Sequence, residues 1–246
     1  PRFRERRRAV ARRQGWPRIA LVSVLASIVL VVALVWPLLH TRLLAARVIT
    51  VSGAHHTAAR AVVSAAGLHS NPPMIDVNAG AAARRIESLP WVATATVARH
   101  WPDGVSITIA ERSPVAVVAR AAGGWAEVDR SGRVLVDVSS RAASLPELAG
   151  AGDPGPPGRW LGARERGGLL VAARLPVALR SEVSAVVVQH GSVVLDLVGG
   201  ATALLGTSAE LTAKFEDVAS ILAAGPLPPH AVIDARVAQS PAVAAS

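Results

Sequence analysis

The sequence contains no cysteine and no tyrosine, and its only lysine is Lys214. The missing cysteines exclude disulfide scaffolds, thiolate zinc sites and cysteine nucleophiles. Their absence does not show whether the protein lies in a reducing or an oxidising compartment, because a domain of sufficient size folds without disulfides. Aromatic residues make up 3% of the chain, whereas sites for single-stranded nucleic acid stack bases on aromatic side chains. Hydrophobic residues make up 51%, which excludes a wholly disordered chain.

The formal net charge of +9 is concentrated at the start of the 246-residue chain. Residues 1–18 contain eight arginines and one acidic residue, Glu5, and carry +7, which leaves +2 for all the rest. Residues 19–246 are nearly neutral overall, so the charge does not call for a basic groove that would bind phosphates. We therefore expect no nucleic acid partner. The great excess of arginine over lysine, together with many alanines, is typical of a gene from a high-GC bacterium.

A segment of 21 residues without charge follows, from Ile19 to Leu39. As a helix it would be about 31 Å long, close to the thickness of a bilayer core. Trp16 and Trp36 lie near its ends, where indoles prefer the membrane interface. A cleaved signal peptide has a shorter apolar run, and a core helix usually has a polar face. We therefore predict a transmembrane helix that contacts the lipid bilayer.

The basic tail over residues 1–18 fixes the predicted orientation. By the positive-inside rule it stays in the cytoplasm, so the chain is expected to be a single-pass type II protein of the plasma membrane, or cell inner membrane, with its C-terminal part extracytoplasmic. Because the chain begins at Pro1 and not at methionine, it stays open whether N-terminal sequence precedes it.

Residues 47–115 have the pattern of a small α+β domain with the order β-α-α-β-β. The expected elements are a strand at 48–53, helices at 57–66 and 78–88, and strands at 91–99 and 105–111. Thr57 and Asn78 stand where N-caps are expected. Residues 101–104 contain Pro and Asp-Gly, which predict a turn between the last two strands.

The pattern of residues 116–239 predicts a mixed α/β domain with a largely antiparallel sheet. Residues 240–246 are expected to form a short tail. The expected strands are 115–120, 125–129, 134–136, 183–189, 193–198, 201–205 and 232–239. One helix is expected at 169–179, interrupted by Pro176. Another follows Thr207, whose spacing to Glu210 fits a capping box. The last strand is expected at the edge of its sheet.

Several short motifs follow one another in a specific order just beyond the apolar segment. They are VITVSG, LPWV, R-x-WP and ER-x-PVA, and their characteristic residues are Gly53, Pro90, Trp91, Val92, Arg99, Trp101, Pro102, Glu111, Arg112 and Pro114. The combination resembles the POTRA-containing FtsQ (DivIB) family of bacterial cell-division proteins. The segments 128–132, 145–148 and 233–236, and the position of Lys214, agree with that family as well.

The resemblance implies a non-enzymatic scaffold of the divisome that links and regulates septal cell-wall synthesis. It also implies partners of the FtsB and FtsL type, with the POTRA domain and the transmembrane helix taking part in recruitment. Edge strands expose unpaired N–H and C=O groups that a partner strand can satisfy. We therefore predict strand addition at the last strand, with the interface formed by Val232, Ile233, Asp234, Ala235, Arg236, Val237 and Ala238.

No motif in the sequence predicts catalysis, a cofactor, a metal site or a small-molecule substrate. His55 and His56 are adjacent and are expected to be solvated polar residues at a helix start. Residues 200–208 resemble a phosphate loop but lack its GK[ST] ending. Glu111 and Arg112 are expected to be surface charges, with a cross-strand pair from Arg99 to Glu111 as a second interpretation.

Three further interpretations stay open from the residues alone. Arg130 and Arg236 are either partner contacts or solvated charges. The chain as a whole could instead be a POTRA-bearing protein of export or assembly, although the residues after 115 do not give enough ten-residue lipid-facing strands for a barrel. A membrane-anchored cell-wall enzyme is the third alternative.

Overall fold

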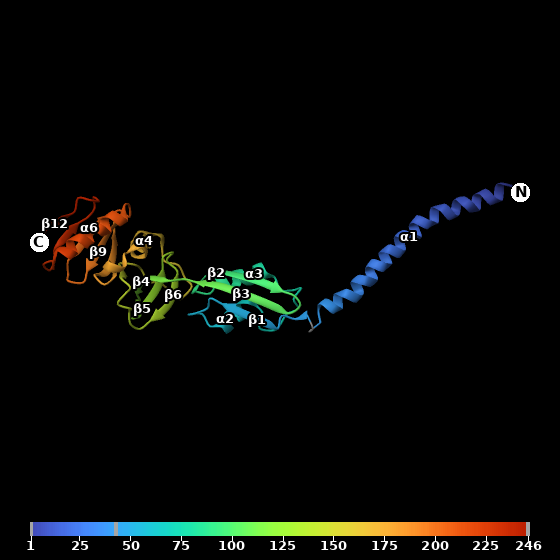
Figure 1. The fold of residues 1–246 in the computed structure, drawn as a ribbon, viewed down its shortest axis with the longest axis horizontal. Helices are drawn as coiled ribbons and strands as arrows, with labels where there is room; N and C mark the ends of the chain where they lie inside the picture. The colour runs from blue at the N-terminus through green and yellow to red at the C-terminus, as the bar shows by residue number, and fades with distance from the viewer. Residues whose placement is uncertain (1, 42–43, 245–246) are drawn as a thin grey trace. The chain divides into compact units, whose positions relative to one another are not determined.

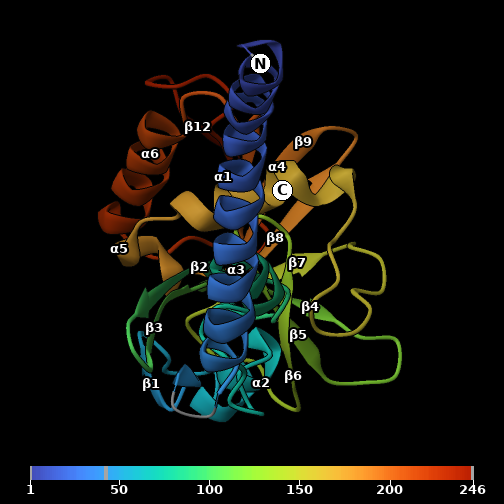
Figure 2. The same cartoon turned by 90° about the vertical axis from the view of Figure 1, so that its right-hand side faces the viewer.

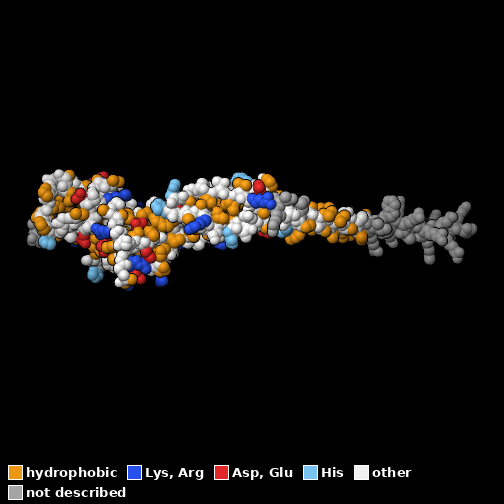
Figure 3. Space-filling model, turned by 90° about the horizontal axis from the view of Figure 1, so that it is seen from below, with side chains coloured by type: hydrophobic (Ala, Val, Ile, Leu, Met, Phe, Trp, Pro, Cys, Tyr) orange, Lys and Arg blue, Asp and Glu red, His pale blue; other side chains and the backbone are white. Residues whose placement is uncertain are grey.

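The computed structural model describes residues 2–41 and 44–244 (Figure 1). It begins with α1 (Arg2–Leu39), within which Ala20–Pro37 has a mean hydropathy of 2.6 and no buried residue. Hydrophobic side chains cover the described part of this helix (Figure 3). By length and composition α1 is able to cross a membrane, and it fits the predicted single-pass anchor.

The elements after α1 occur in the predicted order. They are β1 (Val48–Ser52), α2 (Ala59–Ala66), α3 (Ala79–Glu87), β2 (Val92–His100) and β3 (Gly104–Glu111). The three strands form a sheet in the order β1-β3-β2, in which β1 runs parallel to β3. Asn78 caps α3 as predicted, because its Oδ1 accepts a hydrogen bond from the Ala81 amide at 2.9 Å. The expected cap at Thr57 was wrong, since α2 begins only at Ala59.

A nine-stranded sheet follows, formed by β4 (Pro114–Ala119), β5 (Trp125–Asp129), β6 (Val134–Val138), β7 (Glu147–Ala149), β8 (Val183–Gln189), β9 (Ser192–Leu197), β10 (Thr202–Gly206), β11 (Val232–Asp234) and β12 (Ala242–Ala244). Its order is β12-β11-β10-β9-β8-β7-β4-β5-β6. Parallel pairing occurs between β4 and β7, β7 and β8, and β10 and β11, and the other pairs are antiparallel. The largely antiparallel sheet and the α+β class were thus predicted correctly.

The helices of this region pack against the sheet and form one core with it. They are α4 (Arg166–Arg174), α5 (Val177–Arg180) and α6 (Leu211–Ala224), with a short 3-10 helix, η2 (Ala163–Glu165), before α4. The break between α4 and α5 falls at Pro176, as predicted. The core includes Leu169 of α4 and Phe215 of α6 together with alternate residues of the strands. Figure 2 shows α5 beside α6, which it contacts.

Three predictions at the C-terminal end were wrong. Glu210 directly precedes α6 with a left-handed backbone (φ 51°) and makes no capping hydrogen bond, so the expected capping box does not form. The strand expected over 232–239 is only Val232–Asp234, because β11 ends there. It is also not the edge strand, since β12 pairs with its outer side, with Ile233 opposite Val243.

Lys214, the only lysine, is buried in α6 with 2% exposure. Its Nζ donates hydrogen bonds to the carbonyl oxygens of Leu205 at 2.8 Å and Thr207 at 3.0 Å. The side chain therefore ties the helix to the end of β10 and the loop that follows. A buried ammonium needs such partners, because an unpaired buried charge is very costly.

The chain divides into two compact units. The first consists of residues 1–52, 59–84 and 96–108, and the second of residues 53–58, 85–95 and 109–246. Segments 53–58 and 85–95 lie within the predicted POTRA range but belong to the second unit.

Candidate interaction surface

The outer edge of the nine-stranded sheet is formed by β12, and among the described residues no strand pairs with its outer side. All three of its residues, Ala242–Ala244, are exposed, and Val243 has 50% of its surface accessible. An edge of this kind presents main-chain N–H and C=O groups that another extended chain can satisfy. It is therefore the part of the second unit where strand addition is geometrically open.

The seven residues predicted as a partner interface lie next to this edge but differ in accessibility. Ile233 and Ala235 are fully buried in the core, so their side chains are not available to a partner. Val237 is 67% exposed, and Val232, Asp234 and Ala238 are partly exposed. Arg236 is exposed but paired with Asp234.

Arg236 and Asp234 form a compact ion pair on the surface beside β11. The guanidinium Nε donates to both carboxylate oxygens of Asp234, at 2.9 and 3.1 Å, and the Arg236 amide donates as well. These hydrogen bonds lower the pKa of Asp234 to about 2. The Arg236 guanidinium thus lies against Asp234 at the surface. Arg130, the other arginine considered, is exposed.

The opposite edge of the sheet, at β6, is partly covered by the chain itself. Residues 158–161 run along its start, where the Val134 amide donates to the Arg159 carbonyl oxygen and the Gly158 amide donates to the Val134 carbonyl oxygen. The Leu161 amide likewise donates a hydrogen bond to the Gly132 carbonyl oxygen. Covering an edge with a loop is a common protection against unwanted pairing. The two edges therefore differ, and β12 is the more open.

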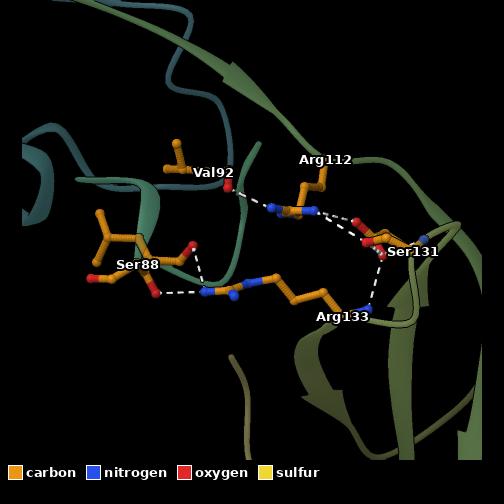
Figure 4. A network of polar contacts seen from close by, with 7 residues as sticks. Ser88, Val92, Arg112, Ser131 and Arg133 are labelled. Atoms are coloured by element: carbon orange, nitrogen blue, oxygen red, sulfur yellow. Dashed lines mark hydrogen bonds and ion pairs between the residues drawn. The ribbon is translucent and has the colours of Figure 1, made fainter. Parts of the chain in front are cut away.

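Three of the sequence motifs meet in one polar network within the second unit (Figure 4). Nη1 of Arg112 lies 2.7 Å from Oδ2 of Asp129, and its Nε donates to the Val92 carbonyl oxygen at 3.0 Å. Arg133 donates from Nη2 to the Ser88 carbonyl oxygen at 2.6 Å, while its amide donates to Asp129. The ER-x-PVA and LPWV motifs and the segment 128–132 are thus joined through two guanidinium groups and one carboxylate.

The network stabilises the Asp129 carboxylate, whereas the two guanidinium groups repel each other. Burial raises the pKa of Asp129, but hydrogen bonds from Ser131, Arg112 and Arg133 lower it by more, so that the net shift is downward. Burial and the neighbouring Arg112 charge lower the pKa of Arg133. The ring of Trp160 lies 5.5 Å from the Arg112 guanidinium and 5.2 Å from that of Arg133, which are cation–π distances.

Glu111 was expected at the surface, and that expectation was wrong. Its side chain is only 7% exposed, and it accepts hydrogen bonds from the amides of His56 and Thr57 and from Nδ1 of His56. Burial raises the pKa of Glu111, but these hydrogen bonds lower it to about 2. The His56 ring in turn stacks on Trp91, with centroids 4.2 Å apart.

The remaining motif residues lie apart from this network. Arg99 does not pair with Glu111 as considered from the sequence, but donates to the Val77 carbonyl oxygen in the first unit. Trp101 and Pro102, joined by a cis peptide bond, form the exposed turn between β2 and β3. Pro114 starts β4. Arg133 and Trp160 were not anticipated at all, because no sequence pattern marks them.

A groove of about 510 Å³ lies beside α5 and α6 in the second unit. Its lining is mainly apolar, with Leu179, Leu197 and Leu222 among the side chains and Glu182 as the charged group. A catalytic pocket usually brings together several polar groups, which this lining does not. Across the described residues, no group of three or more His, Asp or Glu side chains is placed to hold a metal ion.

The comparisons with known proteins agree with the motifs. Residues 44–112 match the family described as "POTRA domain, FtsQ-type". The cell division protein FtsQ of Streptomyces bingchenggensis is 30% identical over 213 residues, which cover 85% of this chain and 80% of the relative. That of Mycolicibacterium smegmatis is 34% identical over 206 residues, 82% of this chain and 58% of the relative.

A solved structure also matches, the major extracytoplasmic domain of the cell division protein DivIB from Geobacillus stearothermophilus. The match has 18% identity and a TM-score of 0.36, and it covers 47% of this chain and 94% of that chain. The two FtsQ relatives come from high-GC bacteria, the kind of source that the arginine-rich composition predicted. From its sequence and its POTRA match, the chain belongs to the FtsQ family of bacterial cell-division proteins, and it is a component of the divisome.

Proposed function

We propose that the chain is a non-catalytic scaffold that binds other division proteins of the FtsB and FtsL type outside the cell membrane. In this role it links them to the control of septal cell-wall synthesis. The observation that carries the proposal is the open edge of the nine-stranded sheet at β12 (Ala242–Ala244), in contrast to the covered edge at β6. Strand addition uses main-chain hydrogen bonds for affinity and alternate side chains for specificity.

The proposed interface consists of the outer side of β12 with the exposed side chains beside it. Val243 and Val237 supply apolar surface, and the Asp234–Arg236 ion pair supplies polar groups. Ile233 and Ala235 support this surface from within the core and do not contact the partner. The interface is thus shifted outward by one strand from the position that the sequence suggested.

We also propose an orientation of the chain in the membrane. The eight arginines of residues 1–18 hold the N-terminus in the cytoplasm and place the POTRA domain and the sheet on the opposite side. Fusing a reporter enzyme that is active only outside the cytoplasm to either end of the chain tests this orientation. Activity of the N-terminal fusion and silence of the C-terminal fusion would contradict it.

A proline in β12 tests the interface. Val243→Pro removes a main-chain N–H and obstructs pairing, so capture of the FtsB-type protein of the same organism should be strongly reduced. Val243→Thr is the matched control, because it keeps the branched shape and the backbone donor and should therefore bind as the parent does. Undiminished capture by a folded Val243→Pro variant would contradict the proposal.

The non-catalytic role has a test of its own. The full chain, incubated with purified peptidoglycan, should release no soluble fragments. Release of fragments that depends on an individual side chain of this chain would favour the alternative of a membrane-anchored cell-wall enzyme.

A further inference from the structure

Large apolar side chains are exposed at only a few places in the described part of the first unit. Outside α1 they are Val48 with 59%, Ile75 with 39% and Trp101 with 54% of their surface accessible. Isolated exposed apolar residues are normal on protein surfaces. These three come from separate parts of the chain, however, so their positions in the fold decide whether they share a surface.

All three residues lie in or beside the stretch of the first unit that follows α1. The Met74 amide, next to Ile75, donates to the Leu44 carbonyl oxygen at 2.8 Å. The turn that carries Trp101 is held to the same stretch, because the Asp103 carbonyl oxygen accepts from the amides of Arg47 and Val48. Val48 therefore lies in the short stretch 44–48 that follows the helix, and Ile75 and Trp101 lie in turns that are hydrogen-bonded to this stretch. These three exposed apolar side chains form what we call the anchored end.

The direction of the strands extends this observation. β1 and β3 run parallel, with Val48 opposite Gly104 and Ser52 opposite Thr108. Both strands therefore start at the anchored end and lead away from it. Four residues of strand span about 13 Å, so Thr108 lies well away from the anchored end while belonging to the same sheet.

The length of the connection limits how far the anchored end can lie from the bilayer. The apolar window ends at Pro37 and α1 at Leu39, whereas Ala45 already pairs with Pro73 in a β-bridge. Six residues span at most about 20 Å when fully extended. His40 shortens this distance, because its Nε2 lies 3.7 Å from Oδ1 of Asp76 in the loop that carries Ile75.

We propose that the anchored end rests on the lipid bilayer, with the Trp101 indole in the headgroup region and Ile75 and Val48 beside it. Indole rings prefer this region because one part of the ring is apolar and the N–H is polar. The occupant is a lipid surface because the tether keeps Ala45, in the stretch to which these side chains belong or are hydrogen-bonded, within about 20 Å of the helix end. The inference rests on the proposed membrane span of α1.

Fluorescent labelling of single cysteines tests the contact, since the chain has no cysteine of its own. Ile75→Cys and Val48→Cys in the full chain are labelled with an environment-sensitive dye and reconstituted into vesicles of phosphatidylcholine and phosphatidylglycerol. Dye emission at both positions should shift to the blue and lose intensity when lipids with a nitroxide on the headgroup are included. At the matched control Thr108→Cys, emission should stay unshifted and unquenched.

Two further variants test whether α1 lies in the bilayer and whether the Trp101 indole holds the anchored end on the lipid. A dye at Ile28→Cys reports whether α1 lies in the bilayer, and nitroxides on the acyl chains should quench it. Combining Trp101→Ser with Ile75→Cys should weaken quenching at position 75 if the indole holds the anchored end on the membrane.

Quenching at position 28 without quenching at 75 and 48 would overturn the docking while leaving the membrane span intact. Absence of quenching at all three positions would overturn both. A blue shift at 75 that lipid nitroxides do not quench, and that grows with protein density in the vesicle, would mean that another copy of the chain covers this surface and would equally overturn the inference. The partner interface at β12 is independent of every one of these outcomes.

Discussion

Arg112 and Asp129 form an ion pair between two largely buried side chains, with 15% and 5% of their surfaces exposed. The same guanidinium group holds the Val92 carbonyl oxygen, so that one arginine joins the LPWV segment to the turn after β5. Removing one partner of a buried pair leaves the other charge without compensation, which costs more than the pair contributes. The motif residues of the second unit are therefore mutually dependent.

Substitution of Arg112 by methionine should lower the free energy of unfolding by about 3 kcal/mol, because the Asp129 carboxylate stays buried without its ion-pair partner. Urea unfolding of the full chain in detergent, followed by tryptophan fluorescence, measures the loss. Arg141→Met is the control, since its pair with Glu147 is longer, at 3.7 Å, and about one third exposed. We expect that variant to lose about 1 kcal/mol or less. Equal losses in the two variants would contradict the assignment.

Lys214 should be chemically protected in the folded protein. Its ammonium group is buried and donates to two carbonyl oxygens, so an amine-reactive ester should modify the peptide that contains it only after unfolding. Mass spectrometry after labelling in increasing urea measures this directly. Lys214→Met keeps the apolar stem but leaves both carbonyl oxygens without their donor, and should destabilise the chain by about 2 kcal/mol. Rapid labelling without urea would show that the side chain is accessible.

The order of most elements was predictable because each has a local cause, whereas the short strands β7 and β12 were not expected. Alternating apolar residues predicted most strands within one or two positions, and Asn78 and Pro176 fixed the start of α3 and the break before α5. The end of β11 was not predictable in this way. Residues 232–237 alternate as a strand would, and the pairing of β11 with β12 is a tertiary contact without a local signal.

The surroundings of the charged motif residues could not be predicted for a similar reason. In sequence, Glu111 and Arg112 are two polar residues at the end of a strand, which is usually a solvated position. Their burial depends on groups far away in the chain, since Glu111 meets the amides of His56 and Thr57 and Arg112 meets Asp129. The motif indicated that these residues matter, but only the fold shows which atoms they contact.

Glu111 should make stability depend on pH in the acid range. Its pKa is lowered from 4.5 to about 2 in the folded state, so its contribution is fully present above pH 4.5 and is lost as the pH falls through 2. At pH 7, Glu111→Gln should therefore reduce the free energy of unfolding by about 2 kcal/mol. The difference between parent and variant should shrink between pH 4.5 and 2, as measured by urea unfolding across that range. A difference that stays constant down to pH 2 would mean that the carboxylate charge is not the cause.

Gly53 should not tolerate a side chain. Its backbone lies in the left-handed region (φ +80°), and a Cβ there would overlap the Ile109 carbonyl oxygen. Gly123 offers a matched comparison, because its φ of +89° is similar but no atom lies within 4 Å of the position that a Cβ would take. In both alanine variants the positive φ costs about 1 kcal/mol. Only in Gly53→Ala does the new Cβ also overlap another atom, the Ile109 carbonyl oxygen.

We expect Gly123→Ala to lose about 1 kcal/mol of unfolding free energy and Gly53→Ala about 3 kcal/mol or more, because the carbonyl must move out of the way or the chain must change its path. Thermal and urea unfolding of the two variants, measured side by side, separates the steric cost from the conformational one. A larger loss at Gly123 than at Gly53 would contradict the close approach of residue 53 to β3. The motif glycine is thus explained by the space it leaves for the Ile109 carbonyl group and not by turn flexibility alone.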